Sequence, residues 1–193
     1  MPEAIRAALD LAFIEFFWDK QLDSEVRNPT VNRSNRGETA MGKELKVGDK
    51  APAFKLVASD GKSHRLAEFK GKCVILFFYP KAMTTGCTQE ACDFRDLATA
   101  LTQRDAVVLG VSRDAPDRLT KFRDKHDLNF LLLSDEDGKV CEAYGVWKEK
   151  SLYGRKFMGI ERTTFVIDAD GRIQNVFAKV KVKGHAAAVV QSL

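Results

Sequence analysis

Two cysteines in the middle of the chain have the residue types and spacing for chemistry. Cys87 follows an apolar run, VILFFY, and a short polar loop that ends at Gly86, where a helix-compatible segment begins. A thiol in the first turn of a helix is stabilised as the thiolate by unpaired backbone N–H groups and by the helix dipole. Cys92 follows five residues later. A reactive thiol with a second thiol on the same element indicates redox chemistry.

The spacing of the two cysteines constrains that chemistry. Five residues of helix turn about 140° net and rise about 7.5 Å, so Cys87 and Cys92 point to different sides of an intact helix. A disulfide needs Cβ atoms about 4 Å apart, so the first turns must unwind before these two can bond. The spacing is not CxxC, and no second cysteine pair or nearby histidine stands at zinc spacing. The alternative is two unreactive cysteines on an amphipathic helix.

The wider context of Cys87 resembles a known family. An apolar strand, a Pro80-x-x-x-Thr84-x-Gly86-Cys87 loop and then Cys92 are similar to the peroxiredoxins, and to their bacterioferritin comigratory protein, or Q-type, group. In that group a resolving cysteine stands five residues after the peroxidatic cysteine. The resemblance therefore implies that Cys87 is peroxidatic and Cys92 resolving.

A second, distant segment carries the same resemblance. GIERTTFVIDADGRI, residues 159–173, is similar to the family's late strand, with its active-site arginine at Arg162. The likeness runs from about residue 46 to residue 182. Thr85 is a departure, because the family usually has proline there, and proline would fix φ and stiffen the loop. We expect a freer loop that is less shielded from water, which bears on the peroxide rate and not on the reaction type.

The resemblance implies a thiol peroxidase acting on hydrogen peroxide and organic hydroperoxides, recycled by thioredoxin. The Cys87 thiolate would attack the peroxide, become a sulfenic acid, and form an intramolecular disulfide with Cys92. A free cysteine titrates near about pH 8.5, so the helix start and the Arg162 guanidinium would both support the thiolate. The Thr84 hydroxyl would bond the thiolate or the peroxide, although threonine is also a common N-cap.

Other residues near Cys87 have two interpretations each. Pro80 and Gly86 would shape the loop and let backbone N–H groups approach the substrate. Tyr79 would line the substrate pocket, or it belongs to the core as the end of a buried strand. Glu90 would orient Arg162, but an exposed helix carboxylate is the commoner use and the one we expect.

The remaining cysteines and the histidines are expected to be structural. Cys73 begins an apolar strand and Cys141 lies in a short helix, and buried cysteine usually behaves as a small hydrophobe. His64, His126 and His185 are scattered at no metal or triad spacing, so we expect surface residues. We expect no metal and no cofactor.

The composition favours a cytoplasmic enzyme. The chain has 193 residues, is 45% hydrophobic, and carries a mild net charge of +4 from interspersed basic and acidic residues. No basic patch with interleaved aromatics supports nucleic-acid binding, and no apolar run approaches the roughly 20 residues of a membrane span. Four cysteines without framework spacing suit a reducing compartment. We expect a monomer or weak dimer.

The first 42 residues differ from the rest. Residues 4–18 place apolar side chains at helical spacing, but acidic residues interrupt the run, which fits neither a signal peptide nor a transit peptide. A polar linker follows, and the peroxiredoxin-like domain is predicted over 43–193. The extension is either a product of gene assignment, with Met41 as the native start, or a segment whose aromatics dock on a partner.

Alternating elements must position these residues. The pattern predicts a hairpin at 54–66, strands at 73–79, 106–112 and 130–133, helices at 86–104, 116–126 and 139–144, a hairpin at 163–168 and 172–179, and a terminal helix at 185–191. Trp147 and its neighbouring lysines predict a solvated loop near the site or a docking face. This order indicates an α/β mixed sheet with helices on both faces, and the resemblance implies a thioredoxin-like fold.

Two other classes of function remain. A disulfide oxidoreductase or redox sensor would use the same cysteines without peroxide turnover, but the loop has the peroxide pattern and not CxxC. A binding module or holdase would leave Thr84, Cys87 and Arg162 as coincidence. Peroxide consumption coupled to thioredoxin oxidation separates all three classes.

Overall fold

The structure is a computed structural model that describes residues 44–152 and 155–193. The predicted N-terminal helix, the linker and the domain boundary at residue 43 lie outside the described residues. The domain boundary therefore stays a prediction.

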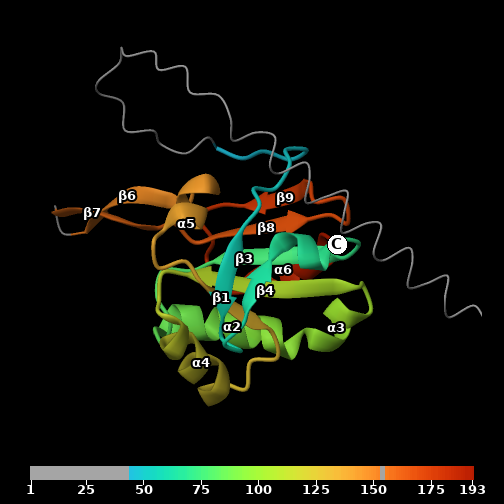
Figure 1. The fold of residues 1–193 in the computed structure, drawn as a ribbon, viewed down its shortest axis with the longest axis horizontal. Helices are drawn as coiled ribbons and strands as arrows, with labels where there is room; N and C mark the ends of the chain where they lie inside the picture. Colours follow the sequence, from blue (N-terminus) through green and yellow to red (C-terminus); the bar gives the residue numbers. More distant parts are fainter. Residues whose placement is uncertain (1–43, 153–154) are drawn as a thin grey trace, which may run out of the picture. The chain divides into compact units, whose positions relative to one another are not determined.

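A seven-stranded mixed sheet forms the centre of the domain (Figure 1). Its order is β2-β1-β5-β4-β3-β8-β9. The strands are β1 (Lys55–Ala58), β2 (Ser63–Arg65), β3 (Cys73–Phe78), β4 (Ala106–Ser112), β5 (Leu131–Ser134), β8 (Thr163–Ile167) and β9 (Ile173–Phe177). β3, β4 and β5 run parallel, while β8 pairs antiparallel with β3 on its other side. The expected mixed α/β sheet is confirmed.

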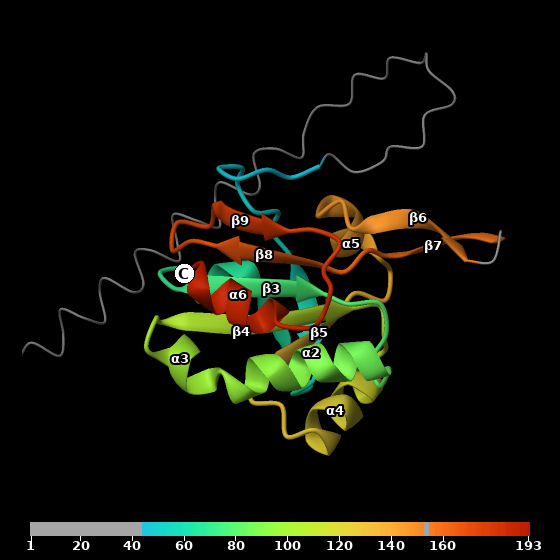
Figure 2. The same ribbon diagram turned by 180° about the vertical axis from the view of Figure 1, so that it is seen from behind.

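Helices cover both faces of this sheet, as the alternating pattern predicts. They are α2 (Thr85–Asp96), α3 (Ala98–Thr102), α4 (Pro116–Lys125), α5 (Lys139–Ala143) and α6 (His185–Gln191), with a 3-10 turn, η1, at Leu66–Phe69. Figure 2 shows α2, α4 and α6 against one face, and their apolar residues share one core cluster. α5 packs into the cluster on the opposite face.

The central strand β3 serves both clusters because its side chains alternate. Leu76 and Phe78 enter the cluster under α5, and Ile75 and Phe77 enter the cluster under α2. Gly110 on the neighbouring strand is required by packing, since a Cβ there would lie 2.7 Å from the Phe77 ring. The end of β3 is thereby fixed on both faces, and the candidate site begins at that end.

Two predicted elements need correction. The single helix expected over 86–104 is broken at Leu97, where ψ is 11° and the chain leaves helical geometry between α2 and α3. The loop expected around Trp147 is a separate antiparallel hairpin, β6 (Trp147–Leu152) and β7 (Arg155–Ile160). Lysines alternate along β6, so its sequence lacks the apolar alternation that predicts a strand. The Trp147 ring is covered by the Arg113 guanidinium, 4.5 Å from the ring centroid.

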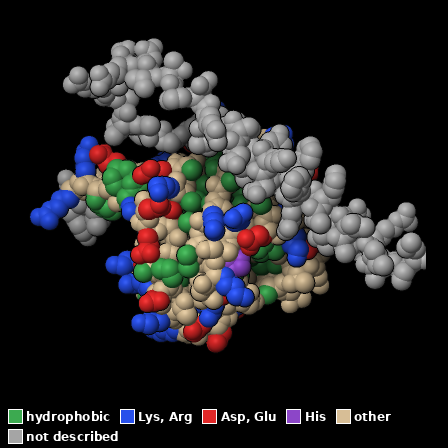
Figure 3. Space-filling model, viewed as in Figure 1, with side chains coloured by type: hydrophobic (Ala, Val, Ile, Leu, Met, Phe, Trp, Pro, Cys, Tyr) green, Lys and Arg blue, Asp and Glu red, His purple; other side chains and the backbone are tan. Residues whose placement is uncertain are grey.

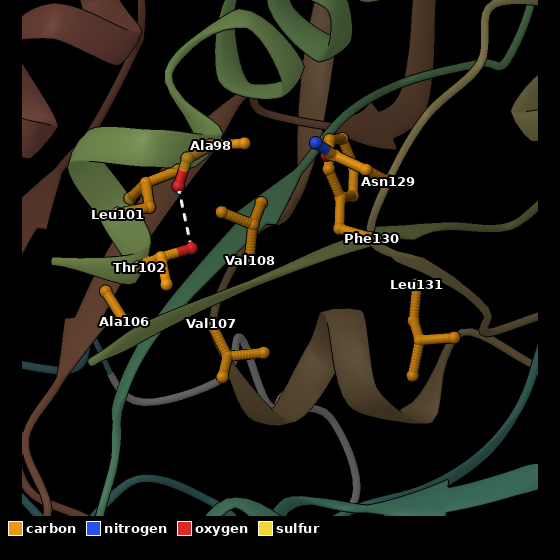
Figure 4. Close-up of a pocket in the computed structure, with 9 residues that line it drawn as sticks. All are labelled: Ala98, Leu101, Thr102, Ala106, Val107, Val108, Asn129, Phe130 and Leu131. Atoms are coloured by element: carbon orange, nitrogen blue, oxygen red, sulfur yellow. Dashed lines mark hydrogen bonds between the residues drawn. The ribbon is translucent and has the colours of Figure 1, made fainter. Parts of the chain in front are cut away.

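A cavity of about 340 Å³ lies beside α3, at the N-terminal ends of β4 and β5. Figure 4 shows its lining, which is apolar apart from Asn129 and Thr102, and the Thr102 hydroxyl donates back to the Ala98 carbonyl at 2.9 Å. None of its lining residues is a candidate site residue. Within 44–152 and 155–193, no helix has the length and apolarity needed to cross a membrane.

Candidate active site

Cys87 lies at the start of α2, where the sequence places it. β3 ends at Phe78, a short loop follows, and α2 begins at Thr85, so Cys87 is in the first turn. The thiol is buried, with 2% of the residue exposed. Because the first N–H groups of a helix have no intrahelical partner, they and the helix dipole favour a negative sulfur there.

Arg162, which lies 75 residues further along the sequence, contacts this sulfur. Its Nη2 donates to Cys87 Sγ at 3.1 Å. The sheet register explains the meeting: β3 and β8 are antiparallel, and Phe78 at the end of β3 pairs with Thr163 at the start of β8. The residue before β8 therefore lies beside the loop that follows β3. The side chain of Arg162 is 14% exposed, so its charge is poorly screened by water.

Glu90 is the second partner of Arg162. Its carboxylate forms an ion pair with Arg162 Nη1, and its side chain is fully buried. The expectation of an exposed carboxylate was wrong, and the alternative interpretation, an anion that orients Arg162, fits the contact. Glu90 lies one turn after Cys87 on α2, so both side chains reach the same guanidinium. Burial raises the pKa of Glu90 to about 7, although the Arg162 charge opposes that rise.

His185 also belongs to this buried cluster. It begins α6, is 6% exposed, and its Nε2 lies 2.8 Å from Thr164 Oγ1 and 3.9 Å from Glu90 Oε1. Burial, together with the nearby Arg162 charge, lowers the pKa of His185 to about 4. The expected surface position was wrong, because α6 folds back onto α2 and nothing in the local sequence signals this contact. His64 and His126 are half-buried and lie elsewhere, on β2 and after α4.

The loop residues take different positions around Cys87. Thr84 is the N-cap residue of α2, but its hydroxyl donates to the Lys81 carbonyl at 3.0 Å and caps no helix N–H. Pro80 is exposed just after β3, and Gly86 is half-buried. A Cβ at Gly86 would lie 3.6 Å from Arg162 Nη2, an ordinary contact distance.

Tyr79 belongs to the core. Its ring stacks on Phe77 at 5.5 Å, the residue is fully buried, and it shares the core cluster of Cys87. Its hydroxyl has no hydrogen-bond partner among the described residues, and burial raises its pKa. The packing therefore supports the core alternative for Tyr79.

The other three cysteines differ in environment. All four cysteines of the chain are free thiols, and Cys92 is half-buried on an intact α2. Burial raises the pKa of Cys73 and of Cys141, and hydrogen bonding to Asp135 also raises that of Cys141. A raised pKa favours the protonated thiol, which is the less reactive form. In the part of the chain that the structure describes, no group of three or more His, Cys, Asp or Glu side chains could hold a metal ion.

Comparisons with known proteins agree on one family. The AhpC/TSA family model matches residues 47–176. Peroxiredoxin Bcp of Bacillus subtilis (strain 168) is 48% identical over 149 residues, which cover 77% of this chain and 95% of that protein. Peroxiredoxin Bcp of Escherichia coli (strain K12) is 49% identical over 149 residues, covering 77% and 96%.

Solved structures give the same result. A structure of Xanthomonas campestris peroxiredoxin Q has a TM-score of 0.70 at 40% identity and covers 72% of this chain and 88% of its own. Peroxidoxin BcpB of Mycobacterium tuberculosis has a TM-score of 0.69 at 37% identity, covering 77% and 96%.

The chain therefore belongs to the AhpC/TSA family, with the thioredoxin-like fold and thiol peroxidase chemistry of a peroxiredoxin. Within that family it is similar to the Bcp, or Q-type, group. The resemblance stated from the motifs around Cys87 and Arg162 is confirmed.

Proposed function

We propose that this peroxiredoxin reduces hydrogen peroxide and organic hydroperoxides with Cys87 as the attacking thiolate. The single observation that carries the proposal is the Arg162 Nη2 contact, 3.1 Å from Cys87 Sγ, at a helix start. A fixed guanidinium stabilises both the thiolate and the charge that develops on the peroxide oxygens. Burial raises the pKa values of Cys73 and Cys141, which opposes thiolate formation at either one.

In the first step the Cys87 thiolate attacks the terminal oxygen of the peroxide. The O–O bond breaks, a sulfur–oxygen bond forms, and the leaving alkoxide or hydroxide takes up a proton to become an alcohol or water. The sulfur is oxidised to a sulfenic acid by two electrons, and the peroxide is reduced by the same two.

Thr84 has a defined part in substrate binding under this proposal. Its only hydroxyl proton is donated to the Lys81 carbonyl, so its oxygen is left to accept a hydrogen bond. A hydroperoxide has one O–H to donate. We therefore assign Thr84 Oγ1 as the acceptor that orients the peroxide proton, while Arg162 faces the oxygens that gain charge.

The second step joins Cys87 to Cys92. The Cys92 thiol attacks the sulfenic sulfur, the S–S bond forms, and the sulfenic oxygen leaves as water. Because α2 is intact over Thr85–Asp96, this step requires unwinding of its first turns. An external dithiol, which the family resemblance suggests is thioredoxin, would then reduce the disulfide and be oxidised in turn. A reducing cytoplasm is the compartment that we propose.

One coupled assay tests the function. We expect peroxide consumption to be stoichiometric with oxidation of thioredoxin by the wild type and absent in Cys87→Ser, while Cys73→Ser and Cys141→Ser remain active. Disulfide exchange without peroxide consumption would favour the redox-sensor class. Neither activity would favour a binding module, and substantial turnover by Cys87→Ser would show that the attacking residue is assigned wrongly.

A further inference from the structure

The loop between β3 and α2 is held by two side chains that belong to neither element. Asp114 Oδ2 accepts a hydrogen bond from the Ala82 backbone N–H at 2.7 Å, and Arg118 Nη2 donates to the Ala82 carbonyl at 2.9 Å. Both backbone polar groups of one loop residue are therefore bound by charged side chains from the β4–α4 region.

The two charged residues are also bound to each other. Arg118 Nε lies 3.1 Å from Asp114 Oδ1, and Ser112 Oγ donates to Asp114 Oδ2 at 2.9 Å. The Asp114 side chain is only 9% exposed, whereas the Arg118 side chain is 43% exposed. Hydrogen bonds to ionised groups are about twice as strong as neutral ones, and a partly buried carboxylate is weakly screened.

The point of attachment, Ala82, lies in the loop that leads into the start of α2. Ala82 is fully buried, and the next residue, Met83, has a positive φ of 66°. Residues other than glycine rarely adopt this region of backbone dihedral angles, so the turn persists only where its surroundings hold it. Thr84 and the first turn of α2 follow directly. Freeing Ala82 would relax the turn from which the helix starts.

We propose that Asp114 and Arg118 form a latch on the loop between β3 and α2. This latch holds the loop in place and sets how often the start of α2 opens. The latch residues do not touch the reacting atoms, so they are positioning residues. The redox consequence rests on the proposed function: Cys92 can attack only after opening, so the latch would also set the rate of disulfide formation.

Amide hydrogen exchange of the reduced, full-length protein tests the latch without any redox step. We expect Arg118→Met and Asp114→Asn to exchange residues 80–92 about tenfold faster than wild type, because each loses a charge-assisted hydrogen bond to the loop. Lys121→Met and Asp117→Asn are matched controls on α4, both exposed, and should leave that segment unchanged. Exchange in β3 and β4 should not change in any variant.

Three outcomes would overturn the latch. The first is unchanged exchange at 80–92 in both Arg118→Met and Asp114→Asn, and the second is an equal rise in the controls. The third is a rise that extends to β3 and β4, which would indicate general destabilisation. Arg118→Met keeps the proposal testable if Asp114→Asn does not fold.

The redox consequence is measured separately by quenching after one equivalent of hydrogen peroxide. Disulfide formation should accelerate by up to about tenfold in Arg118→Met, while the first oxidation slows by less than about twofold, because the closed form still predominates. Faster exchange with an unchanged disulfide rate would refute the claim that the latch limits this step. If the wild type forms no Cys87–Cys92 disulfide, the proposed function fails, and exchange alone decides the latch.

Discussion

At the residue scale, the site contains one guanidinium that faces two acids. Arg162 contacts Cys87 through Nη2 and Glu90 through Nη1. When two acids share one buried cation, loss of a proton from one makes loss from the other less favourable. Glu90 therefore orients Arg162 and, when ionised, competes with the Cys87 thiolate for its charge.

Removing the guanidinium should weaken the thiolate and the transition state together. In Arg162→Ala, we expect slower alkylation of Cys87 by iodoacetamide at neutral pH, because a nearby positive charge favours the thiolate. The peroxide rate should fall by roughly 10²-fold or more, beyond the loss of thiolate, as for removal of one oxyanion donor. Arg155→Ala, on the exposed side of β7, is the matched control. An unchanged alkylation rate and an unchanged peroxide rate would remove Arg162 from the site.

Neutralising Glu90 should act in the opposite direction on the thiolate. Glu90 has a pKa raised to about 7, so it is mainly protonated below that pH and ionised above it. In Glu90→Gln, the peroxide rate near neutral pH should rise, because Arg162 is then free to pair with the Cys87 thiolate, and the group that titrates near about pH 7 should vanish from the peroxide-rate profile. Stopped-flow rates from pH 5 to 9 measure both effects. Identical profiles would contradict the shared-charge account.

At the element scale, the proposed function gives α2 two incompatible tasks. Its intact first turn would support the Cys87 thiolate, yet Cys92 could reach Cys87 only after that turn unwinds. Local opening can cost far less than global unfolding, particularly at a helix end. Thr85 is exposed and, unlike proline, leaves φ free, so it should make this opening easier.

Removing the resolving thiol should separate the two steps. Cys92→Ser should complete the first oxidation at close to the wild-type rate and then stall as the sulfenic acid or proceed to sulfinic acid. Intact-protein mass spectrometry counts the added oxygen atoms, and a sulfenic-acid trap distinguishes the first product. Cys73→Ser is the matched control. Normal multiple turnover with thioredoxin by Cys92→Ser would rule out its resolving role.

The sequence predicted the elements whose pattern is local. β3 is a continuous apolar run, and α4 begins with Pro116 in a position that a helix start accepts, so both were predicted almost to the residue. β6 was missed because Lys148 and Lys150 alternate where apolar residues would mark a strand. Those lysines are stabilised by bonds to the following segment, such as Lys148 to Glu161, that no local pattern reveals.

The site was predictable only in part for the same reason. Cys87 is identified by its loop and helix start, which are local. Arg162 lies 75 residues away, and no local feature places it beside the thiol; only the family likeness suggested it. Glu90 and His185 were assigned to the surface. Their burial depends on the packing of α6 against α2, which no local sequence pattern reveals.

At the scale of the whole domain, the sheet brings distant segments together at the C-terminal ends of β3 and β4. The antiparallel β3–β8 pair delivers Arg162, and the parallel β3–β4 pair delivers Asp114 to the same loop. Figure 3 shows charged side chains of both signs scattered over one face, in keeping with the interspersed charges of the sequence. At the start of α6, His185 lies 3.9 Å from Glu90.

Burial of His185 should make domain stability depend on pH. Its folded pKa of about 4 lies below its ordinary value of 6.5, so the unfolded chain binds the proton more readily. Stability that is present above pH 6.5 is therefore lost as pH falls towards about 4. Relative to His185→Gln, the wild type should lose on the order of 2 kcal/mol over this window. Urea unfolding at pH 7 and pH 4.5 measures it, and parallel losses in both proteins would contradict a neutral, buried His185.

The central claim is that Cys87 and Cys92 are the two redox partners of a peroxide reductase. Peptide mapping of the full-length protein after one equivalent of hydrogen peroxide tests it most directly. The account predicts one intramolecular Cys87–Cys92 disulfide in the wild type, absent in Cys87→Ser, with Cys73 and Cys141 still free. A Cys87–Cys141 bond, a linkage between two chains, or a Cys87 thiol that survives the peroxide would contradict it.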